Sequence, residues 1–366
     1  MHIGIEAERA NNPQKTGVEH YTKQLILQFA KLDSANQYTL YLRTEPAEWL
    51  KNLPPNFFCK VLPFPIFWTQ LRLSWEMFWH PPDLLFIPAS ALPFWSPKNC
   101  LVTIHDVAWL FFPEAFTWFM RNYLHYSTRF AVWKARYILV NSQATATDLI
   151  NHYNVSQEKI KHTPFGFDTS PIPDSQFSEK IKAKITEPYI LFLSTLQPRK
   201  NLPALIDAVA LLKKNQPELP HKLIVAGRPG WKYEAILEKI KANPEIVTYL
   251  DYVSDDDRLR LLKHATVLAM PSLYEGFGMQ ILEAFYTKTP VISSNVSSLP
   301  EVAGQGAIYF EPTDISAMAE ALKQVLTQPE LRNDLIKKGQ LQLAKFSWQQ
   351  CAQLSLAVIE KAGRES

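Results

Sequence analysis

The stretch 266–285 constrains the fold most, because it changes from strand-like to helix-like sequence across a loop that carries two glycines. It opens with the largely apolar run 266–270, which is typical of a strand buried on both faces. A proline, a serine and the glycines follow, and apolar residues then recur at helical spacing, at Met279, Leu282 and Phe285. A strand, a loop and a helix N-terminus in this order present backbone N–H groups that can bind an anion.

Two glutamates flank this predicted anion site, Glu275 and Glu283, with seven residues between them. If the helix begins near Gly278, the rise of ~1.5 Å per residue separates the two carboxylates by roughly 10 Å or more. That is too far for the pair of a retaining glycosidase, which is roughly 5 Å apart. The spacing suits an elongated ligand that presents both an anion and hydroxyls. A nucleotide sugar is such a ligand, with its diphosphate at the helix N-terminus and its ribose near Glu283.

Length and composition narrow the class of protein. A chain of 366 residues predicts two domains of roughly 150–200 residues each. The net charge of +3 gives no reason to expect nucleic acid binding. We expect neither a signal peptide nor a membrane-spanning segment, since no stretch reaches roughly 18 apolar residues. The three cysteines lack metal-ligand spacing and predict free thiols in a reducing cytoplasm: Cys59, Cys100 and Cys351.

Strand-like and helix-like segments alternate through the first half, which predicts a mostly parallel sheet covered on both faces. The expected strands are 2–7, 38–42, 60–62, 84–87, 101–104 and 137–140. The loop after the first strand carries Gly17, a weak dinucleotide signal that nevertheless lets a ligand approach the backbone closely. The strand 101–104 ends at His105 and Asp106, at the sheet edge where ligands bind in such folds.

A polar, proline-bearing run at 169–174 predicts the domain boundary, so that the domains are 1–170 and 171–347. The second half repeats the α/β pattern, with strands expected at 189–193, 222–227, 246–249, 266–270, 290–294 and 308–310, and helices at 202–214, 315–326, 331–343 and 348–360. Arg199 and Lys200 stand at the first junction of strand and helix. Two adjacent cations there can neutralise a diphosphate, Arg199 as a fork and Lys200 as a point charge.

Aromatic residues crowd the first half, where eight of the ten tryptophans precede residue 134. The favoured interpretation is an aromatic core, and the expected members include Phe57, Phe64, Phe67, Trp68, Trp75, Phe78 and Trp79. The alternative is an exposed aromatic surface at a membrane or around a lipid acceptor. The predicted helix 116–136 carries Arg121, His125 and Arg129 at four-residue intervals. We favour a solvated face for this stripe, with contact to anionic lipid as the alternative.

Several motifs in sequence order resemble one family of enzymes. Residues 275–283 resemble an E-x7-E signature, residues 198–201 a PRKN element, and residues 103–106 a TxHD element. Further similar segments are 15–19, 141–142, 166–168, 271–274 and 298–302. The chain therefore resembles, over nearly its whole length, the group-4 family of retaining glycosyltransferases, which have the GT-B fold.

The resemblance implies two Rossmann-like α/β domains that face each other across a cleft. It assigns the acceptor side to 1–170 and the nucleotide-sugar donor to 171–347, with the final helix, 348–366, crossing back to the first domain. The implied catalytic residues are Glu275, His105, Arg199 and Lys200. Those implied to bind the donor are Gly17, Tyr252, Val253, Gly276, Phe277, Gly278, Leu282 and Glu283.

Individual roles also follow from the resemblance. Arg199 and Lys200 would bind the diphosphate, while Glu275 would contact the transferred sugar. Glu283 would bind the ribose hydroxyls, and His105 would reach the sugar from the first domain. The cations and helix N–H groups would stabilise the leaving diphosphate.

The implied reaction moves a hexose-type sugar from a nucleotide-diphosphate donor to a hydroxyl of a glycan or lipid-linked glycan, with retention of configuration. No cofactor and no divalent metal are expected, and the acidic triplet 255–257 is interpreted as a helix start. The expected location is the cytoplasm, with the cytoplasmic face of the inner membrane as the alternative. Peripheral contact with an anionic membrane belongs to that alternative and rests on the aromatic and basic residues of the first half.

Two other functions stay open. One is a non-catalytic glycan-binding protein that keeps the fold, and the other is a GT-B nucleotide-sugar epimerase. A Rossmann oxidoreductase is disfavoured because the glycine fingerprint of that class is missing.

Overall fold

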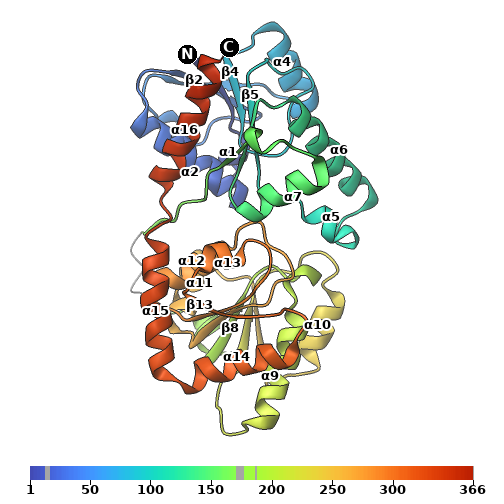
Figure 1. Ribbon diagram of the computed structural model, residues 1–366, viewed down its shortest axis with the longest axis vertical. Coiled ribbons are helices and arrows are strands. Elements are labelled where there is room, and N and C mark those ends of the chain that lie inside the picture. The colour runs from blue at the N-terminus through green and yellow to red at the C-terminus, as the bar shows by residue number, and fades with distance from the viewer. Residues whose placement is uncertain (13–16, 170–176, 186–187, 366) are drawn as a thin grey trace. The chain divides into compact units, whose positions relative to one another are not determined.

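The computed structural model describes residues 1–12, 17–169, 177–185 and 188–365 (Figure 1). They form two compact units. Unit 1 comprises Met1–Phe111, Thr117–Gly166 and Phe346–Ser366, and unit 2 comprises Phe112–Phe116 and Phe167–Lys345. The change of unit at Phe167 lies four residues before the boundary expected at 171. The end of the chain returns to unit 1.

Unit 1 is built on a seven-stranded parallel sheet with the order β3-β2-β1-β4-β5-β6-β7. Its strands are β1 (His2–Glu6), β2 (Gln37–Leu42), β3 (Phe57–Val61), β4 (Leu84–Ile87), β5 (Cys100–Ile104), β6 (Tyr137–Val140) and β7 (Ile160–His162). Every residue of β4, β5 and β6 is buried, as expected for central strands with helices on both faces. The order reverses at β1, and the carboxyl ends of strands at such a switch point are where doubly wound sheets bind ligands.

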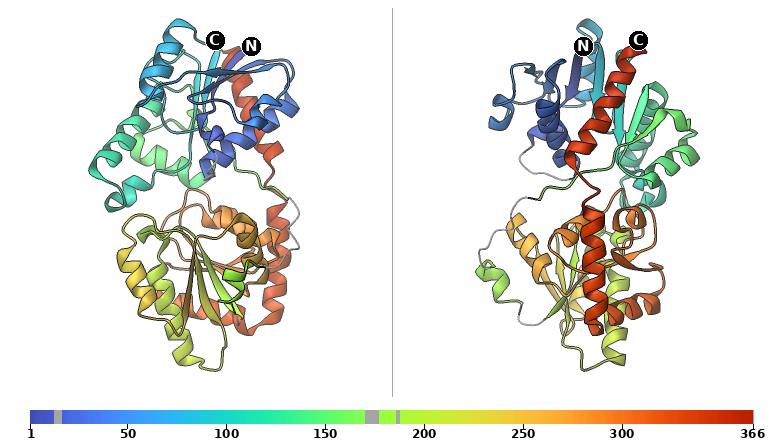
Figure 2. Two further views of the ribbon diagram at one scale, coloured as in Figure 1. Left: turned by 180° about the vertical axis from the view of Figure 1, so that it is seen from behind. Right: turned by 60° about the vertical axis from the view of Figure 1, so that its left-hand side comes forward.

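The helices of unit 1 are α1 (Glu8–Asn11), α2 (Gly17–Leu32), α3 (Glu48–Lys51), α4 (Ser74–Trp79), α5 (Ala108–Phe111), α6 (Trp118–Lys134), α7 (Gln143–Tyr153) and α16 (Trp348–Arg364), with a short π-helix, η1 (Thr69–Leu73), before α4. Ser142 caps α7 by accepting a hydrogen bond from the Thr145 amide at 3.2 Å. The last helix, α16, packs against α2, and Figure 2 shows it running along unit 1. The close approach leaves no room for a side chain at Gly166, whose Cβ would lie 2.0 Å from the Trp348 amide nitrogen.

Unit 2 repeats the plan with a six-stranded parallel sheet in the order β10-β9-β8-β11-β12-β13. Its strands are β8 (Tyr189–Leu193), β9 (Lys222–Ala226), β10 (Val247–Asp251), β11 (Val267–Met270), β12 (Val291–Ser294) and β13 (Ala307–Phe310). Its helices are α8 (Glu179–Lys182), α9 (Leu202–Asn215), α10 (Glu234–Lys241), α11 (Asp255–His264), α12 (Met279–Tyr286), α13 (Leu299–Ala303), α14 (Ile315–Thr327) and α15 (Pro329–Leu343), with a 3₁₀ turn, η4 (Pro198–Lys200), before α9. The predicted sequence of strand, loop and helix at 266–285 is present as β11, its following loop and α12.

The aromatic-core prediction is wrong for most of its members. Phe57 and Trp68 are buried, but Trp75, Phe78 and Trp79 are 55–60% exposed, and Phe64 and Phe67 are exposed as well. The short helix α4 explains the difference, because its inward face carries Ser74, Glu76 and Met77 instead of the rings. None of the described helices is long and apolar enough to cross a membrane.

Candidate functional site

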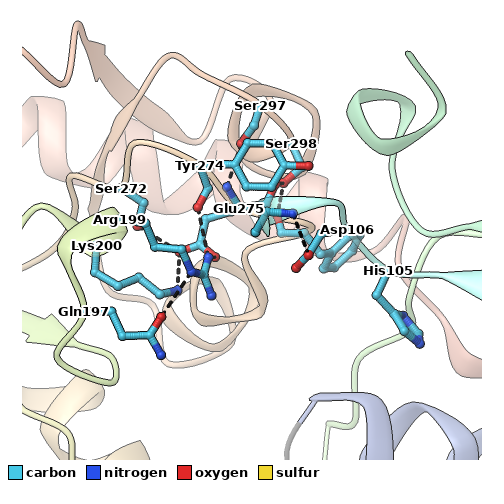
Figure 3. A network of polar contacts seen from close by, with 12 residues as sticks. His105, Asp106, Gln197, Arg199, Lys200, Ser272, Tyr274, Glu275, Ser297 and Ser298 are labelled. Carbon is cyan, nitrogen blue, oxygen red and sulfur yellow. Dashed lines mark hydrogen bonds and ion pairs between the residues drawn. The ribbon is translucent and has the colours of Figure 1, made fainter. Parts of the chain in front are cut away.

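The loop between β11 and α12 has a fixed backbone in unit 2. Gly278 precedes α12 with φ of 100°, a conformation that favours glycine, and a Cβ there would lie 2.7 Å from the Leu299 side chain. The Ser297 hydroxyl accepts a hydrogen bond from the Glu275 amide at 2.9 Å. The Ser298 hydroxyl lies 2.9 Å from the carbonyl oxygens of both Glu275 and Phe277 (Figure 3). These contacts hold 275–278 against the turn that leads into α13.

Glu275 binds both cations of the predicted diphosphate site (Figure 3). Its side chain is only 7% exposed, and Oε2 accepts a hydrogen bond from Arg199 Nη1 at 3.1 Å. Oε1 contacts Lys200 Nζ and accepts a bond from the Ser272 hydroxyl at 2.8 Å. Burial acts to raise the pKa of Glu275, but Lys200 and Arg199 outweigh it and lower the pKa. One ionised carboxylate and two cations therefore form a buried cluster with one positive charge in excess.

The turn after β8 is attached to the loop after β11. Arg199 Nη1 donates to the Tyr274 carbonyl oxygen at 3.0 Å, and the Arg199 carbonyl oxygen accepts from the Leu273 amide at 2.8 Å. Asn201 Nδ2 donates to the carbonyl oxygens of Pro271 at 3.1 Å and Pro312 at 2.8 Å. Because β8 and β11 are neighbours in the sheet, both loops leave at its carboxyl edge.

Glu283 lies on α12 and has a different partner. Its Oε1 contacts Arg258 Nη1 of α11, and Arg258 Nε also lies 3.4 Å from Asp255. Burial opposes the charge on Arg258, but Glu283 outweighs it and raises the pKa of Arg258. Among the residues that the structure describes, Glu283 Oε2 is buried without a hydrogen-bond partner. One carboxylate oxygen of Glu283 is thus held by Arg258, and the other has no hydrogen-bond donor among the described residues.

The Tyr252–Val253 turn follows β10 and contacts Arg228, which follows β9 and was not predicted from the sequence. The Tyr252 ring is 56% exposed, and the Arg228 guanidinium lies 3.9 Å from its centroid. Val253 is buried, and Leu282, another predicted donor contact, is fully buried in the core. No pattern along the chain pointed to Arg228 or Arg258, because each finds its partner about 25 residues away.

His105 lies at the carboxyl end of β5 in unit 1. Its Nε2 is 2.9 Å from the Pro88 carbonyl oxygen, while Nδ1 is buried with no partner among the described residues. The ring meets Tyr21 edge-on, with 5.0 Å between centroids. Burial lowers the pKa of His105, so the imidazole is neutral at pH 7. With Nε2–H donating to Pro88, Nδ1 is left as an acceptor.

The remaining predicted features are Gly17 in unit 1 and the acidic triplet 255–257 in unit 2. Gly17 begins α2. Among the described residues, apart from its chain neighbours and the backbone of its own helix, no heavy atom lies within 4 Å of a Cβ built on it. Lys15 and Thr16, which belong to the same predicted loop, lie outside the described residues. The acidic triplet starts α11, as predicted, with Ser254 accepting from the Asp257 amide at 3.1 Å. In the described part of the chain, no group of three His, Cys, Asp or Glu side chains is arranged to hold a metal ion.

Comparison with known proteins identifies the family. Residues 174–342 match the family described as Glycosyl transferases group 1, and residues 15–171 match Glycosyltransferase Family 4. The O-antigen chain mannosyltransferase B of Escherichia coli is 30% identical over 261 residues, which cover 69% of this chain and 68% of that protein. The chain belongs to glycosyltransferase family 4. The family predicted from the motifs is confirmed.

One solved structure and one further relative are also similar to this family 4 glycosyltransferase. Sucrose-phosphate synthase from Thermosynechococcus elongatus superposes with a TM-score of 0.77 over 100% of both chains, at 19% identity, which shows the GT-B fold. The serotype-specific mannosyltransferase WbdA of Escherichia coli is 29% identical over 74% of this chain. The match covers 34% of WbdA, so the chain spans about a third of that relative.

Proposed function

We propose that this glycosyltransferase moves a hexose-type sugar from a nucleotide-diphosphate donor to a hydroxyl of a glycan or lipid-linked glycan, with retention of configuration, in polysaccharide biosynthesis. The cluster of Arg199, Lys200 and Glu275 at the carboxyl edge of the unit 2 sheet carries the proposal. Two similar proteins are named as mannosyltransferases, one of them for the O-antigen chain. A mannose donor is therefore the first to test.

The charge of the cluster supports donor binding. A diphosphate beside Arg199 and Lys200 would contact two cationic side chains. The N-terminus of α12 adds backbone N–H groups and the positive end of its dipole. Glu275 holds the two cations in place and offers its carboxylate to sugar hydroxyls. Glu283 keeps Oε2 for a ribose hydroxyl. Because the cluster carries one positive charge in excess and the N-terminus of α12 adds the positive end of its dipole, we propose that no divalent metal is needed.

We propose a front-face substitution at the anomeric carbon. The bond from that carbon to the leaving phosphate oxygen breaks, while the acceptor hydroxyl forms the new bond on the same face. The acceptor proton passes to the departing diphosphate. Arg199 and Lys200 stabilise the charge that develops there. His105 in unit 1 stays a predicted contact of the sugar. A product of inverted configuration would contradict this route.

A thermal-shift panel of UDP-, GDP-, ADP- and dTDP-sugars tests the proposal, because a ligand that binds only the folded state raises the melting temperature. We expect one nucleotide class to raise it, and Lys200→Ala to weaken binding of that donor sharply in calorimetry. Transfer to an acceptor should persist with EDTA present. Unchanged donor affinity in Lys200→Ala would refute the diphosphate role, and no response to any nucleotide sugar would refute the function.

The same assays separate the alternatives. A glycan-binding protein without activity would neither hydrolyse nor transfer the donor. A nucleotide-sugar epimerase would convert the donor with no acceptor present. The retained Arg199, Lys200 and Glu275 cluster favours transfer over the first of these.

We propose that the enzyme works in the cytoplasm, at the inner face of the membrane when its acceptor is lipid-linked. Free Cys59, Cys100 and Cys351 suit a reducing compartment.

A further inference from the structure

Unit 1 exposes large aromatic side chains that the proposed sugar transfer does not use. We define the aromatic surface by Trp75, Phe78, Trp79, Trp95, Trp118 and Trp133, which are 55–75% exposed. Soluble monomers rarely expose large contiguous apolar patches, and those that do use them for binding.

Ring contacts link five members of the aromatic surface across three segments, and the sixth, Trp118, lies at the start of α6. On α4, the Trp79 ring lies 6.1 Å from Trp75 and 5.1 Å from Phe78, and Phe78 lies 5.8 Å from Trp95. The loop that holds Trp95 continues the surface to α6.

Two contacts make the connection to α6. The Phe130 ring lies 6.1 Å from Phe94, the neighbour of Trp95, and 6.0 Å from Trp133. Gln70 of η1 donates to the Tyr123 hydroxyl of α6 at 2.9 Å. Figures 1 and 2 show α4 and α6 following one another along the same side of unit 1.

The charges beside the rings are positive. Helix α6 contains Arg121, Arg129 and Lys134 and no acidic residue. Within the described residues, neither Arg121 nor Arg129 has an acidic partner, and Arg129 is exposed. A basic helix bearing exposed tryptophans is the composition that binds the interface of an anionic bilayer.

The one acidic residue of α4, Glu76, does not offset the positive charge of α6. Glu76 is 4% exposed and forms ion pairs with Lys60 and, at 3.4 Å, with Arg72. Its negative charge is held inside by two cations, so the outer side of α4 presents only the rings of Trp75, Phe78 and Trp79.

We propose that the aromatic surface docks unit 1 onto an anionic lipid bilayer, with its tryptophans at the headgroup level and Arg121 and Arg129 on lipid phosphates. Trp and Tyr rings favour this level because one part of each is apolar and another can hydrogen-bond. A second copy of the chain fits less well, since the cores of protein interfaces are depleted of charge and α6 contains no acid to pair with the arginines of a second copy.

The proposal is independent of sugar transfer and is tested without a donor. The purified protein is sedimented with vesicles of phosphatidylcholine alone or with phosphatidylglycerol added. We expect binding only to the anionic vesicles and weaker binding as salt rises. Arg121→Gln with Arg129→Gln should weaken binding roughly 30-fold, at about 1 kcal/mol per cation. Trp118→Ser with Trp133→Ser should weaken it at least roughly tenfold.

Matched controls lie outside the aromatic surface. Trp231 is 50% exposed on unit 2, so Trp231→Ser should bind vesicles like the wild type. Lys241→Gln with Arg364→Gln removes two exposed cations from α10 and α16 and should also leave binding unchanged. These side chains are exposed except Arg121, which is half-buried without an acidic partner among the described residues, so we expect the melting temperatures to stay close to that of the wild type.

The unchanged protein offers a second measurement. Phosphatidylglycerol with brominated acyl chains should quench the tryptophan emission if the rings insert. No binding to anionic vesicles, no quenching, or equal binding by the aromatic-surface variants and their controls would each overturn the proposal. A dimer that Trp118→Ser with Trp133→Ser converts to monomer would also overturn it, because the occupant would then be a second copy.

Discussion

Arg258 holds Glu283 by one oxygen and leaves the other buried without a partner among the described residues. An unsatisfied buried carboxylate oxygen costs free energy, which a ribose hydroxyl would recover on binding. Arg258 is thus a positioning residue whose effect passes through Glu283.

We predict that Arg258 sets the preference for ribose. Wild-type protein should bind the nucleoside diphosphate roughly tenfold or more tightly than its 2′,3′-dideoxy analogue, as one hydrogen bond to a charged group is worth ~1.5–3 kcal/mol. In Arg258→Leu this ratio should fall towards one, and Arg258→Lys should keep part of it. Calorimetry with both ligands measures the ratio. An undiminished ratio in Arg258→Leu would show that Glu283 needs no help from Arg258.

We predict that the folding free energy depends on pH through Glu6, which lies at the carboxyl end of β1. Burial raises the pKa of Glu6 from 4.5 to about 7. A carboxyl whose folded pKa exceeds its unfolded pKa contributes fully below pH 4.5, and that contribution is lost as pH rises through 7. Roughly 3 kcal/mol of folding free energy should disappear from the wild type between pH 4 and pH 8.

Glu6→Gln isolates this effect, because a glutamine Oε1 can still accept the 3.1 Å hydrogen bond from the Glu8 amide. Urea denaturation at both pH values should show the variant gaining stability over the wild type at pH 8 only. A constant difference between the two proteins would mean that Glu6 keeps an ordinary pKa.

Two glycines that precede or begin helices should respond differently to alanine: Gly278, before α12, and Gly17, at the start of α2. Gly278→Ala forces an alanine into φ of 100° and against Leu299 at 2.7 Å, so we expect about 1–3 kcal/mol of destabilisation. Gly17→Ala adds a Cβ at the start of α2 that meets no heavy atom of the other described residues within 4 Å, so this variant should not be destabilised. If a donor approaches the backbone at Gly17, that variant should still bind it more weakly. Thermal unfolding and donor calorimetry on both variants separate the two effects, and a stable Gly278→Ala protein would refute the requirement for glycine.

Elements with strong apolar runs could be predicted from sequence, and marginal ones could not. The stretch at 266–285 predicted β11 and α12 because a buried parallel strand and an amphipathic helix have different periods. The edge strand β7 has three residues, none of them buried, so no such run marked it. The aromatic residues of α4 were wrongly assigned to the core, because a helix of six residues is too short for its period to reveal which face is buried.

The candidate site shows the same limit. Residue type and spacing predicted the cations and both glutamates, but not that Glu275 pairs with Arg199 and Lys200 or Glu283 with Arg258. Those pairs join residues 75, 76 and 25 positions apart, and only the order of β8 and β11 and the packing of α11 on α12 bring them together.

The chain as a whole makes two units and then returns to the first through α16. Trp348, at the start of that helix, is 3% exposed and lies among His20, Tyr21 and Phe165, with ring centroids 5.4, 6.3 and 5.9 Å away. Unit 1 therefore completes its core only with residues at the far end of the sequence. Since each unit has its own sheet and core, heating should unfold the protein in two separable steps.

Calorimetric unfolding of Trp348→Ala, with and without donor nucleotide, tests whether the two units unfold separately. Loss of a buried tryptophan costs about 3–5 kcal/mol, which should lower the unit 1 transition by roughly 10 °C. The indole Nε1 has no hydrogen-bond partner among the described residues, so the loss is one of packing. Donor nucleotide should raise the other transition, since its proposed contacts Arg199, Lys200 and Glu283 all lie in unit 2. Calorimetry that showed a single transition, moved by both the substitution and the nucleotide, would mean that the two units unfold as one.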